Sequence, residues 1–554
     1  MADILSNSVS GLLAVQRALT TTGQNVSNAN TEGYSRQTVN MSARDPQFVG
    51  NGYVGTGTQV QSITRSFDQF VESQLRDATS DSSRLTFVSD FASQVTGVLG
   101  DSESGISQAT GAFFDAAGDV AANPTDTTAR NAFLNEAEAL AGRFNQMDSQ
   151  LAKLDDGVGR QASSMAGEVN TLASEVAELN GKITTATQQN PNSPPNDLLD
   201  RRDQLVKEIA DRIDIRVDDD GKGGLNLAVG SGQALVTGNT SNELSARNSP
   251  AGLSIEISGR DITSRVAGGQ LGGMIEAQST LITPLRNELG RVAATMAQEV
   301  NAVQEAGVDL NGDDGKPLFT DIGDFQPAVS SDRGNSGNGE ATGEITEAKQ
   351  LQDTRYVARF DGGSNEWVIR DERDPGTTIA RVDPGTTDNP TSEIPGLSLT
   401  FSGNPEGGDA LYIDPAVGAA GQIRTQLSDP DEVAAAVEGS GAGSRDNTNI
   451  EALSRLADQN LVGQDDADEG GESLGGALTS AVTGAGAVAR NAEQQGESSR
   501  SALESLQARR ESVSGVNLDE EAAKLLQYQQ QYQALARSIS VSGDLFQSVL
   551  NAVR

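Results

Sequence analysis

The chain has 554 residues, and its 78 acidic and 40 basic side chains give a formal net charge of −38. It contains no cysteine and no histidine, which excludes disulfides, thiolate or imidazole metal ligands, and catalysis by a cysteine nucleophile or a histidine base. The acidic excess argues against nucleic acid or an anionic membrane as partner. The length is enough for about three or four domains of ~100 to 200 residues each.

The first 30 residues are predicted to form an amphipathic helix. Apolar and small side chains recur at alternating three- and four-residue steps, which is the seam of a coiled coil. The seam consists of Leu5, Ser8, Leu12, Val15, Leu19, Thr22 and Val26. The N-terminus has no positively charged segment followed by an apolar core, so we expect no cleaved signal peptide. Such a helix cannot bury its stripe alone and requires a partner.

The next segments alternate between loop and helix patterns. Residues 28–58 are rich in Gly and Asn, and helical spacing follows from Ile63 to about Leu99. A long helical pattern then runs from Phe133 to Ile183, with a one-residue phase change near Gly157 and Gly159. This predicts either one helix of ~75 Å with a skip or two helices that meet there.

The centre of the chain has a strand pattern. Period-two runs separated by Gly-rich turns predict strands at 213–218, 225–229 and 253–258, and a helix is expected over 272–306. A second β region is predicted from 317 to 415. Its strands are expected at 356–360, 366–370, 378–382, 397–401 and 410–413. Asp429, Pro430 and Glu432 form a helix-start pattern, so helix is predicted to resume there.

From Leu474 to the end the pattern is almost wholly helical, and the last helix repeats every seven residues. The repeat consists of Leu518, Leu525, Tyr532, Ile539 and Phe546, widened by Tyr528, Leu535 and Val549. Residues 1–80 hold five basic and six acidic side chains and residues 500–554 hold six of each, so the middle carries −37. We therefore expect the near-neutral ends to crowd together and the acidic middle to face water. Because their intrinsic helix propensity is weak, the ends are predicted to be disordered in a free monomer.

Four polar segments resemble functional sites in composition. Residues 309–315 lack the Gly and Glu that an EF-hand needs, so a turn with local Asx hydrogen bonds is favoured over a calcium loop. Asp197, Asp200 and Asp203 could be acid/base carboxylates, but a solvated helix face is favoured. Residues 218–220 indicate a hairpin turn. Residues 51–57 lack the Lys-Ser/Thr of a phosphate loop. We thus predict no catalytic, cofactor or metal site, and no enzyme.

Four sequence blocks, in order along the chain, carry a resemblance. Residues 25–39, NVSNANTEGYSRQTV, resemble the N-terminal signature of bacterial flagellar rod, hook and hook-associated proteins, and residues 33–37 look like the version in the hook-associated proteins. Residues 196–205 (NDLLDRRDQL), 307–312 (GVDLNG) and 516–523 (VNLDEEAA) are similar to further segments of that family. Arg201 and Gln304 depart from its usual residues, Gln and His.

The resemblance implies an α+β multidomain protein. Residues 1–60 with 513–554 would form a terminal coiled-coil assembly domain, and 61–316 with 426–512 a helical rod domain containing a small β region, 213–260. Residues 317–425 would form an inserted outer antiparallel β domain. The implied assembly residues are Leu5, Leu12, Val15, Leu19, Val26, Asn28, Asn30, Gly33, Tyr34, Leu518, Leu525, Tyr528, Tyr532, Leu535, Ile539, Phe546 and Val549.

The implied function is that of a structural adaptor that joins hook to filament. It would be exported by the flagellar type III apparatus and would assemble at the distal end of the hook, outside the cell. Its partners would be other copies in a ring or helical layer, hook protein, a second junction protein and a cytoplasmic chaperone on the C-terminal helix. It would bind neither nucleic acid nor membrane and would need no cofactor. Two alternatives are another axial protein, such as hook protein or flagellin, and an exported subunit with a calcium-dependent adhesive β insertion.

Overall fold

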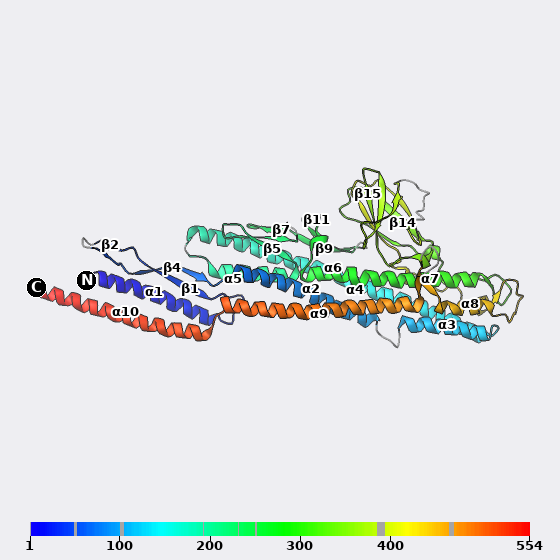
Figure 1. The fold of residues 1–554 in the computed structure, drawn as a ribbon, viewed down its shortest axis with the longest axis horizontal. Helices are drawn as coiled ribbons and strands as arrows, with labels where there is room; N and C mark the ends of the chain where they lie inside the picture. Colours follow the sequence, from blue (N-terminus) through cyan, green and yellow to red (C-terminus); the bar gives the residue numbers. More distant parts are fainter. Residues whose placement is uncertain are drawn as a thin grey trace.

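The computed structural model describes residues 2–48, 52–99, 105–191, 193–230, 232–249, 252–384, 394–464 and 470–553. The molecule is elongated, with both termini together at one end and a β domain that projects sideways near the other end (Figure 1). The sequence order is therefore nested in space, with the chain running out along the rod and returning.

The terminal end consists of two helices and a long hairpin. Helix α1 (Ala2–Ser27) packs against α10 (Leu518–Val553), and strands β1 (Gln37–Ala43) and β4 (Thr58–Arg65) pair beside α1. A two-residue pair, β2 (Gln47–Phe48) and β3 (Tyr53–Val54), continues the hairpin.

The hairpin corrects the predicted helix from Ile63, because Ile63 lies in β4. Helix α2 begins at Gln69 instead. The carboxylate of Asp68 accepts the backbone N–H of Phe70 at 2.9 Å and of Val71 at 3.3 Å, so it caps the helix and marks its true start.

The rod is a bundle of long helices. The pattern with a phase change forms one continuous helix, α4, of 63 residues. Gly159 lies where a Cβ would approach Asn248 Cβ to 2.4 Å, so the glycine allows strand β9 (Leu244–Ser249) to lie against α4. The predicted helix over 272–306 is interrupted by a π-helical turn, Gln278–Ile282. The rod helices are α2 (Gln69–Leu99), α3 (Ile106–Ala122), α4 (Thr127–Gln189), α5 (Asn196–Arg212), α6 (Gly269–Ala277), α7 (Thr283–Glu305), α8 (Thr448–Arg455) and α9 (Leu474–Ser514).

Two small antiparallel sheets lie along the rod. One has the order β5-β6-β7-β8 and the other β11-β10-β9. The predicted strands correspond to β5, β6 and β10, whereas β7 and β9 were not predicted. The bounds are β5 (Ile215–Asp219), β6 (Leu225–Val229), β7 (Gln233–Thr237), β8 (Thr240–Ser241), β9 (Leu244–Ser249), β10 (Gly252–Ile257) and β11 (Arg260–Asp261). At the β5–β6 turn, Asp220 accepts the N–H groups of Lys222 and Gly224, which confirms the predicted hairpin turn.

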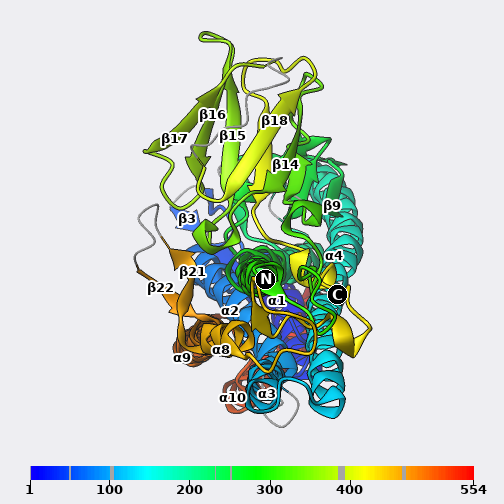
Figure 2. The same cartoon turned by 90° about the vertical axis from the view of Figure 1, so that its right-hand side faces the viewer.

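The outer β domain is a two-layer sandwich (Figure 2). A five-stranded sheet of order β13-β19-β15-β16-β17 packs on the pair β14-β18, and Trp367 stacks on Phe401 with centroids 5.4 Å apart. All five predicted strands are present. The bounds are β13 (Ala328–Ser331), β14 (Glu340–Ile345), β15 (Tyr356–Asp361), β16 (Glu366–Asp371), β17 (Thr378–Val382), β18 (Leu397–Ser402) and β19 (Ala410–Asp414).

The helix predicted after Asp429 is wrong. Asp429 does accept the N–H of Asp431, at 3.0 Å, but only a single 3-10 turn, Pro430–Glu432, follows. Beyond it the chain is held extended, because the Arg130 guanidinium donates to the carbonyls of Pro430 and Val433. Short pairs β12 (Gly307–Val308) with β20 (Ala436–Val437), and β21 (Asn460–Gln464) with β22 (Gly470–Ser473), complete this region.

The turn at 309–315 is an Asx turn, as predicted. The carboxylate of Asp309 accepts the backbone N–H of Asn311 at 2.8 Å and of Asp313 at 2.9 Å. These bonds occupy one carboxylate oxygen of Asp309 with local backbone donors.

Candidate assembly site

Helices α1 and α10 run antiparallel and meet along a seam of small residues. Ser8 and Ser538 hydroxyls lie 3.1 Å apart, and a Cβ added at Gly11 would lie 3.2 Å from Leu535 Cδ2. Further along, the Asn25 amide donates to the Glu521 carboxylate at 2.9 Å. Because this register places Ser8 opposite Ser538, the end of α10 extends past the start of α1 (Figure 1).

The buried side of α1 differs from the predicted stripe. Its buried positions are Ser8, Ser10, Gly11, Ala14, Val15, Ala18, Thr21, Thr22 and Asn25. Among the predicted apolar residues only Val15 is buried, Leu12 and Leu19 are half-buried, and Leu5 and Val26 are exposed. Small residues allow the helix to lie close to both α10 and the β1–β4 hairpin, so the larger apolar side chains turn outward.

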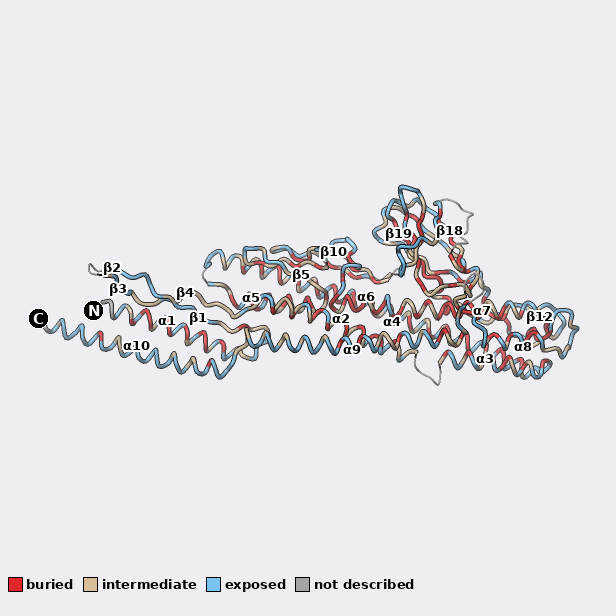
Figure 3. The backbone as a smooth tube through the Cα atoms, in the orientation of Figure 1, coloured by how far each residue is buried: buried red, intermediate tan, exposed pale blue. Residues whose placement is uncertain are grey.

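The predicted stripe of α10 is also divided. Leu525, Tyr528, Leu535 and Ile539 are half-buried. Leu518, Tyr532, Phe546 and Val549 are exposed, the last two on the part of α10 that extends past α1. Figure 3 shows α10 as mostly exposed, in contrast to the red core of the rod.

The outward apolar side chains of both helices form what we call the open apolar surface. No described residue buries them. The surface consists of Leu5, Val9, Leu13 and Val26 on α1 and Leu518, Leu526, Tyr532, Val541, Leu545, Phe546 and Val549 on α10.

The loop after α1 holds the other predicted residues. Asn28 donates to the Gln24 carbonyl at 3.1 Å and closes the helix end, whereas Asn30 is exposed. Gly33 has φ +81°, a conformation that favours glycine, and a Cβ added there would lie 3.2 Å from Gln204 Oε1.

Asn25 is the centre of a polar network that joins three segments. Its amide oxygen accepts the Tyr34 hydroxyl at 2.8 Å and the Gln37 N–H at 2.9 Å. Its amide nitrogen donates to the Gln37 carbonyl and to Glu521 of α10. Burial, helped by the charges of Asp197, Asp200 and Glu521, raises the pKa of Tyr34 to about 12. The neutral phenol is thus the form that this site holds.

A second network fastens the loop to the rod. Asp200 accepts the Ser35 N–H at 3.0 Å and the Arg65 guanidinium at 2.8 Å, and Arg65 also contacts Asp203 at 2.6 Å. Burial lowers the pKa of Arg65, but the charges and hydrogen bonds of Asp203 and Asp200 raise it by more. The prediction of a solvated helix face is therefore wrong for Asp200 and Asp203, and correct only for the exposed Asp197.

These networks explain residues that the sequence stripes did not single out. Asn25, Ser35, Asp200 and Glu521 lie in the four sequence blocks that carry the resemblance, whereas Arg65 lies outside them. All five are polar, and the periodicity of apolar side chains does not indicate them. The alternation of Ser8, Gly11, Val15, Ala18 and Thr22 is the signal that would have found the seam.

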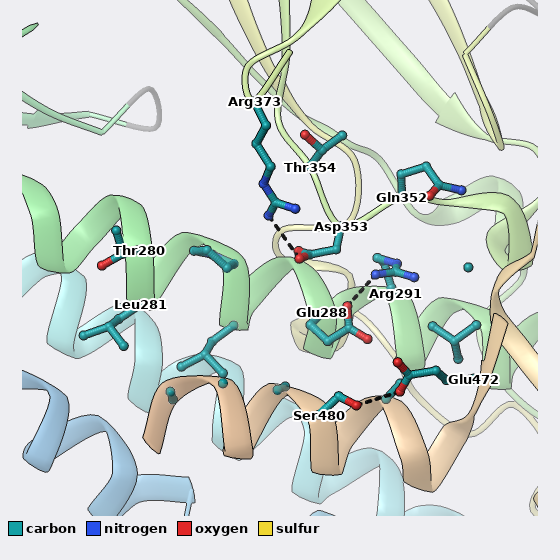
Figure 4. A pocket seen from close by; sticks show the side chains of 18 of the residues that line it. Thr280, Leu281, Glu288, Arg291, Gln352, Asp353, Thr354, Arg373, Glu472 and Ser480 are labelled. Carbon is teal, nitrogen blue, oxygen red and sulfur yellow. Dashed lines mark hydrogen bonds and ion pairs between the residues drawn. The ribbon is translucent and has the colours of Figure 1, made fainter. Parts of the chain in front are cut away.

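A cavity of about 750 Å³ lies where the outer β domain meets α7 and α9. Figure 4 shows two ion pairs in its lining, Glu288 with Arg291 and Asp353 with Arg373 at 3.0 Å, and the Ser480 hydroxyl donating to Glu472 at 2.8 Å. Burial raises the pKa of the Glu288 carboxyl, and the facing Arg291 opposes that shift. Within the described ranges, no cluster of three or more Asp, Glu, His or Cys side chains could hold a metal ion.

Comparison with known proteins gives the family. Residues 92–319 match the "Flagellar hook-associated protein FlgK helical domain", residues 5–34 match "Flagella basal body rod protein", and residues 509–552 match "Flagellar basal body rod FlgEFG protein C-terminal". Flagellar hook-associated protein 1 of Salmonella typhimurium is 30% identical, and that of Escherichia coli 31% identical, over 100% of both chains. The chain belongs to the flagellar hook-associated protein 1 family.

A more distant relative and a solved structure agree with this membership. The hook-associated protein 1 of Bacillus subtilis is 26% identical over 98% of this chain and 96% of its own. The flagellar hook junction protein FlgK from Burkholderia pseudomallei shares the fold, with a TM-score of 0.70 and 21% identity over 80% of this chain and 100% of that one. The α+β multidomain class and the hook-associated function predicted from the sequence are confirmed.

As a hook-associated protein, the chain is a part of the bacterial flagellum. Among the described residues, none of the helices is both long and apolar enough to cross a membrane. Its relatives are structural flagellar proteins, and it associates with the hook and other flagellar components.

Proposed function

We propose that this chain is a non-enzymatic adaptor between hook and filament that assembles through its terminal helices. The observation that carries the proposal is the open apolar surface. After α1 and α10 have paired, Leu13 remains 56% exposed, Leu526 62% and Phe546 57%. Each such side chain gains about 1.5 to 3 kcal/mol when it is fully buried, so neighbouring subunits supply what the single chain lacks.

Charge supports the same arrangement. Residues 1–80 and 500–554 together carry −1, whereas the rest of the chain carries −37. Neutral ends can lie side by side in many copies around an axis, while the acidic rod and outer domain face water. The division into a terminal domain (1–60 with 513–554), a rod (61–316 with 426–512) and an outer domain (317–425) belongs to this proposal.

The proposed partners follow from these surfaces. Other copies of this chain, hook protein and a second junction protein would cover the open apolar surface in the assembled flagellum. Before export through the type III apparatus, without a cleaved signal peptide, a cytoplasmic chaperone would cover α10. No cofactor, nucleic acid or membrane takes part.

Deletion of the gene in the source organism tests the role. We expect hooks without filaments and release of unpolymerised flagellin, both reversed when the full chain is restored. Normal filaments on the deletion strain would refute the proposal.

A surface variant tests the open apolar surface itself. Leu526→Asp combined with Phe546→Asp should leave the purified chain folded and yet fail to restore filaments. Val437→Asp, at a valine of the rod that is 40% exposed, is the matched control and should restore them.

A further inference from the structure

The two outward faces of the outer β sandwich carry opposite charges. On the five-stranded sheet, Arg359 of β15 lies opposite Val368 of β16, and Val368 lies opposite Arg381 of β17. In the next row Arg370 lies between Val357 and Thr378. We call this side, which points away from β14 and β18, the arginine face.

Among the described residues, two of these arginines have no carboxylate partner. Arg381 pairs with Glu366 at 3.1 Å, and the exposed Asp361, two residues after Arg359 along β15, lies on the same face. Arg359 donates to the Gly408 carbonyl, at 3.2 Å. The Nε of Arg370 is buried without an acceptor. Among the described residues, no carboxylate oxygen lies within 4.0 Å of a guanidinium nitrogen of Arg359 or Arg370. In a chain with almost two acids per base, such a face is unusual.

The opposite side of the sandwich is acidic. Strand β14 exposes Glu340, Thr342 and Glu344, while the alternate residues face the core. Its partner strand places Ser402, Thr400 and Ser398 beside them. No basic residue occurs on this side of the two strands, and neither glutamate has an ion-pair partner among the described residues. We call it the glutamate face. Figure 2 shows β14 and β18 forming the second layer beside β15, β16 and β17.

We propose that the arginine face of one copy of this chain docks on the glutamate face of the next copy. The inference rests on the proposed function, because it requires copies that lie side by side. A head-to-tail contact between two different faces repeats around an axis, as a ring or as a helical layer, whereas a face that binds itself stops at a dimer. Arg359 and Arg370 lie one strand and two residues apart, ~8 Å, and Glu340 and Glu344 lie four residues apart, ~13 Å, a difference that long arginine side chains can span.

Charge complementarity selects a second copy as the occupant. Every copy carries −38, so neighbouring outer domains repel unless opposite charges meet between them. Exposed charges of this kind raise the association rate and fix the orientation of two partners more than they raise the affinity. The contact would therefore supplement the packing of the terminal helices and would not replace it. Val357, which is half-buried beside Arg370, supplies apolar contact in the same face, whereas Val368 is buried.

Thiol cross-linking tests the contact, because the chain has no cysteine. Thr378→Cys lies on the arginine face and Thr342→Cys on the glutamate face, and both threonines are exposed. Flagella from cells that carry the double variant are treated with a short bifunctional maleimide. We expect a ladder of dimers and higher oligomers, and no cross-linked product from either single variant. Thr378→Cys with Thr479→Cys, at an exposed position of α9, is the control and should give no ladder.

Charge reversal provides the second arm. Arg359→Glu with Arg370→Glu, or Glu340→Arg with Glu344→Arg, should each lower the ladder yield about tenfold. All four changes together should restore the ladder yield, because the charges of the two faces are then exchanged and remain complementary.

The outcomes separate this inference from the proposed function. If the double cysteine variant restores filaments but gives no ladder, the inference alone is overturned. If the unmodified chain restores no filaments in the deletion strain, the proposed function is overturned. Dimers from one single variant would show a self-complementary face and overturn the head-to-tail contact. Binding of heparin that depends on Arg359 and Arg370, without a ladder, would assign the face to a polyanion instead.

Discussion

The rod and the terminal helix pair are both long-helix structures, yet they bury their side chains differently. In the rod, Phe113, Phe133 and Phe144 are completely buried. In α10, no described hydrophobic side chain is buried, and α1 buries only Ala14, Val15 and Ala18 among its described hydrophobic residues. The rod therefore has a complete core of its own, whereas the terminal pair has an incomplete core, which neighbouring subunits would complete in the proposed assembly.

The largest contrast is expected from protease sensitivity of the free chain. The terminal pair lacks a core, so its local opening should cost little compared with unfolding of the rod. Limited proteolysis of the purified monomer should therefore remove residues 1–30 and 518–554 well before the rod is cut. Protection of these ends in the monomer would contradict both this prediction and the expected disorder of the free termini.

Removal of a rod aromatic should have a large effect on stability. Phe133→Ala leaves a cavity where the ring contacts Phe113, with centroids 5.1 Å apart, and should lower the free energy of unfolding by about 3 to 5 kcal/mol. Urea unfolding followed by circular dichroism measures it. Phe70→Ala, at a ring that is 64% exposed, should change it by less than about 0.5 kcal/mol. Equal losses of unfolding free energy in the two variants would contradict the difference between the rod core and the surface.

Loss of the network that joins the loop after α1 to the rod should have the next largest effect on stability. Asp200→Ala removes the acceptor of the Ser35 N–H and leaves Asp203 as the one carboxylate partner of the buried Arg65 among the described residues, at a cost of about 3 kcal/mol to the local structure. Hydrogen exchange of the Ser35 amide reports it directly. Asp197→Ala, on the exposed side of the same helix, should leave that exchange rate almost unchanged.

Substitutions at two nearby positions of α1 should distinguish the seam with α10 from the open apolar surface. Val15→Ala should lower the stability of the α1–α10 pair by about 2 kcal/mol, seen as faster amide exchange in α1. Leu13→Ser should change exchange in the free chain little, because Leu13 is already 56% exposed, but should reduce incorporation into flagella. Wild-type incorporation of Leu13→Ser would contradict the open apolar surface.

The smallest effect concerns Tyr34 and pH. Its folded pKa of about 12 lies above the value of 10.0 for a free tyrosine, so its contribution is complete below pH 10 and is lost as pH rises toward 12. Tyr34→Phe should remove about 1 kcal/mol near neutral pH, through the lost bond to Asn25, and should flatten the stability loss between pH 10 and 12. Melting temperatures across that range measure it, with Tyr53→Phe, at an exposed ring, as the matched control. An unchanged slope in Tyr34→Phe would refute it.

Much of the local structure could be predicted from periodicity. The terminal helices, the 133–183 helix pattern and all five strands predicted between 356 and 413 are present, because burial of one face dictates the spacing of apolar side chains. Strands such as β14, whose sequence EATGEI buries only Ile345, carry too little of that signal. The helix predicted after Asp429 fails because Arg130, 299 residues earlier in the chain, holds the carbonyls of Pro430 and Val433.

The assembly site divides along the same line. The sequence by itself determines that the site lies at the two ends, that these ends are nearly neutral and that their helices are amphipathic. Charge and the spacing of apolar residues can be read within each segment, without knowledge of its neighbours in the fold. Which side of each helix faces inward was decided only by the tertiary structure. Small residues such as Gly11 and Ala18 permit close approach to α10 and the β1–β4 hairpin, and this rotates the larger Leu13 outward. The partners of Asn25 and Asp200 come from segments up to 496 residues away, and only the folded chain brings them together.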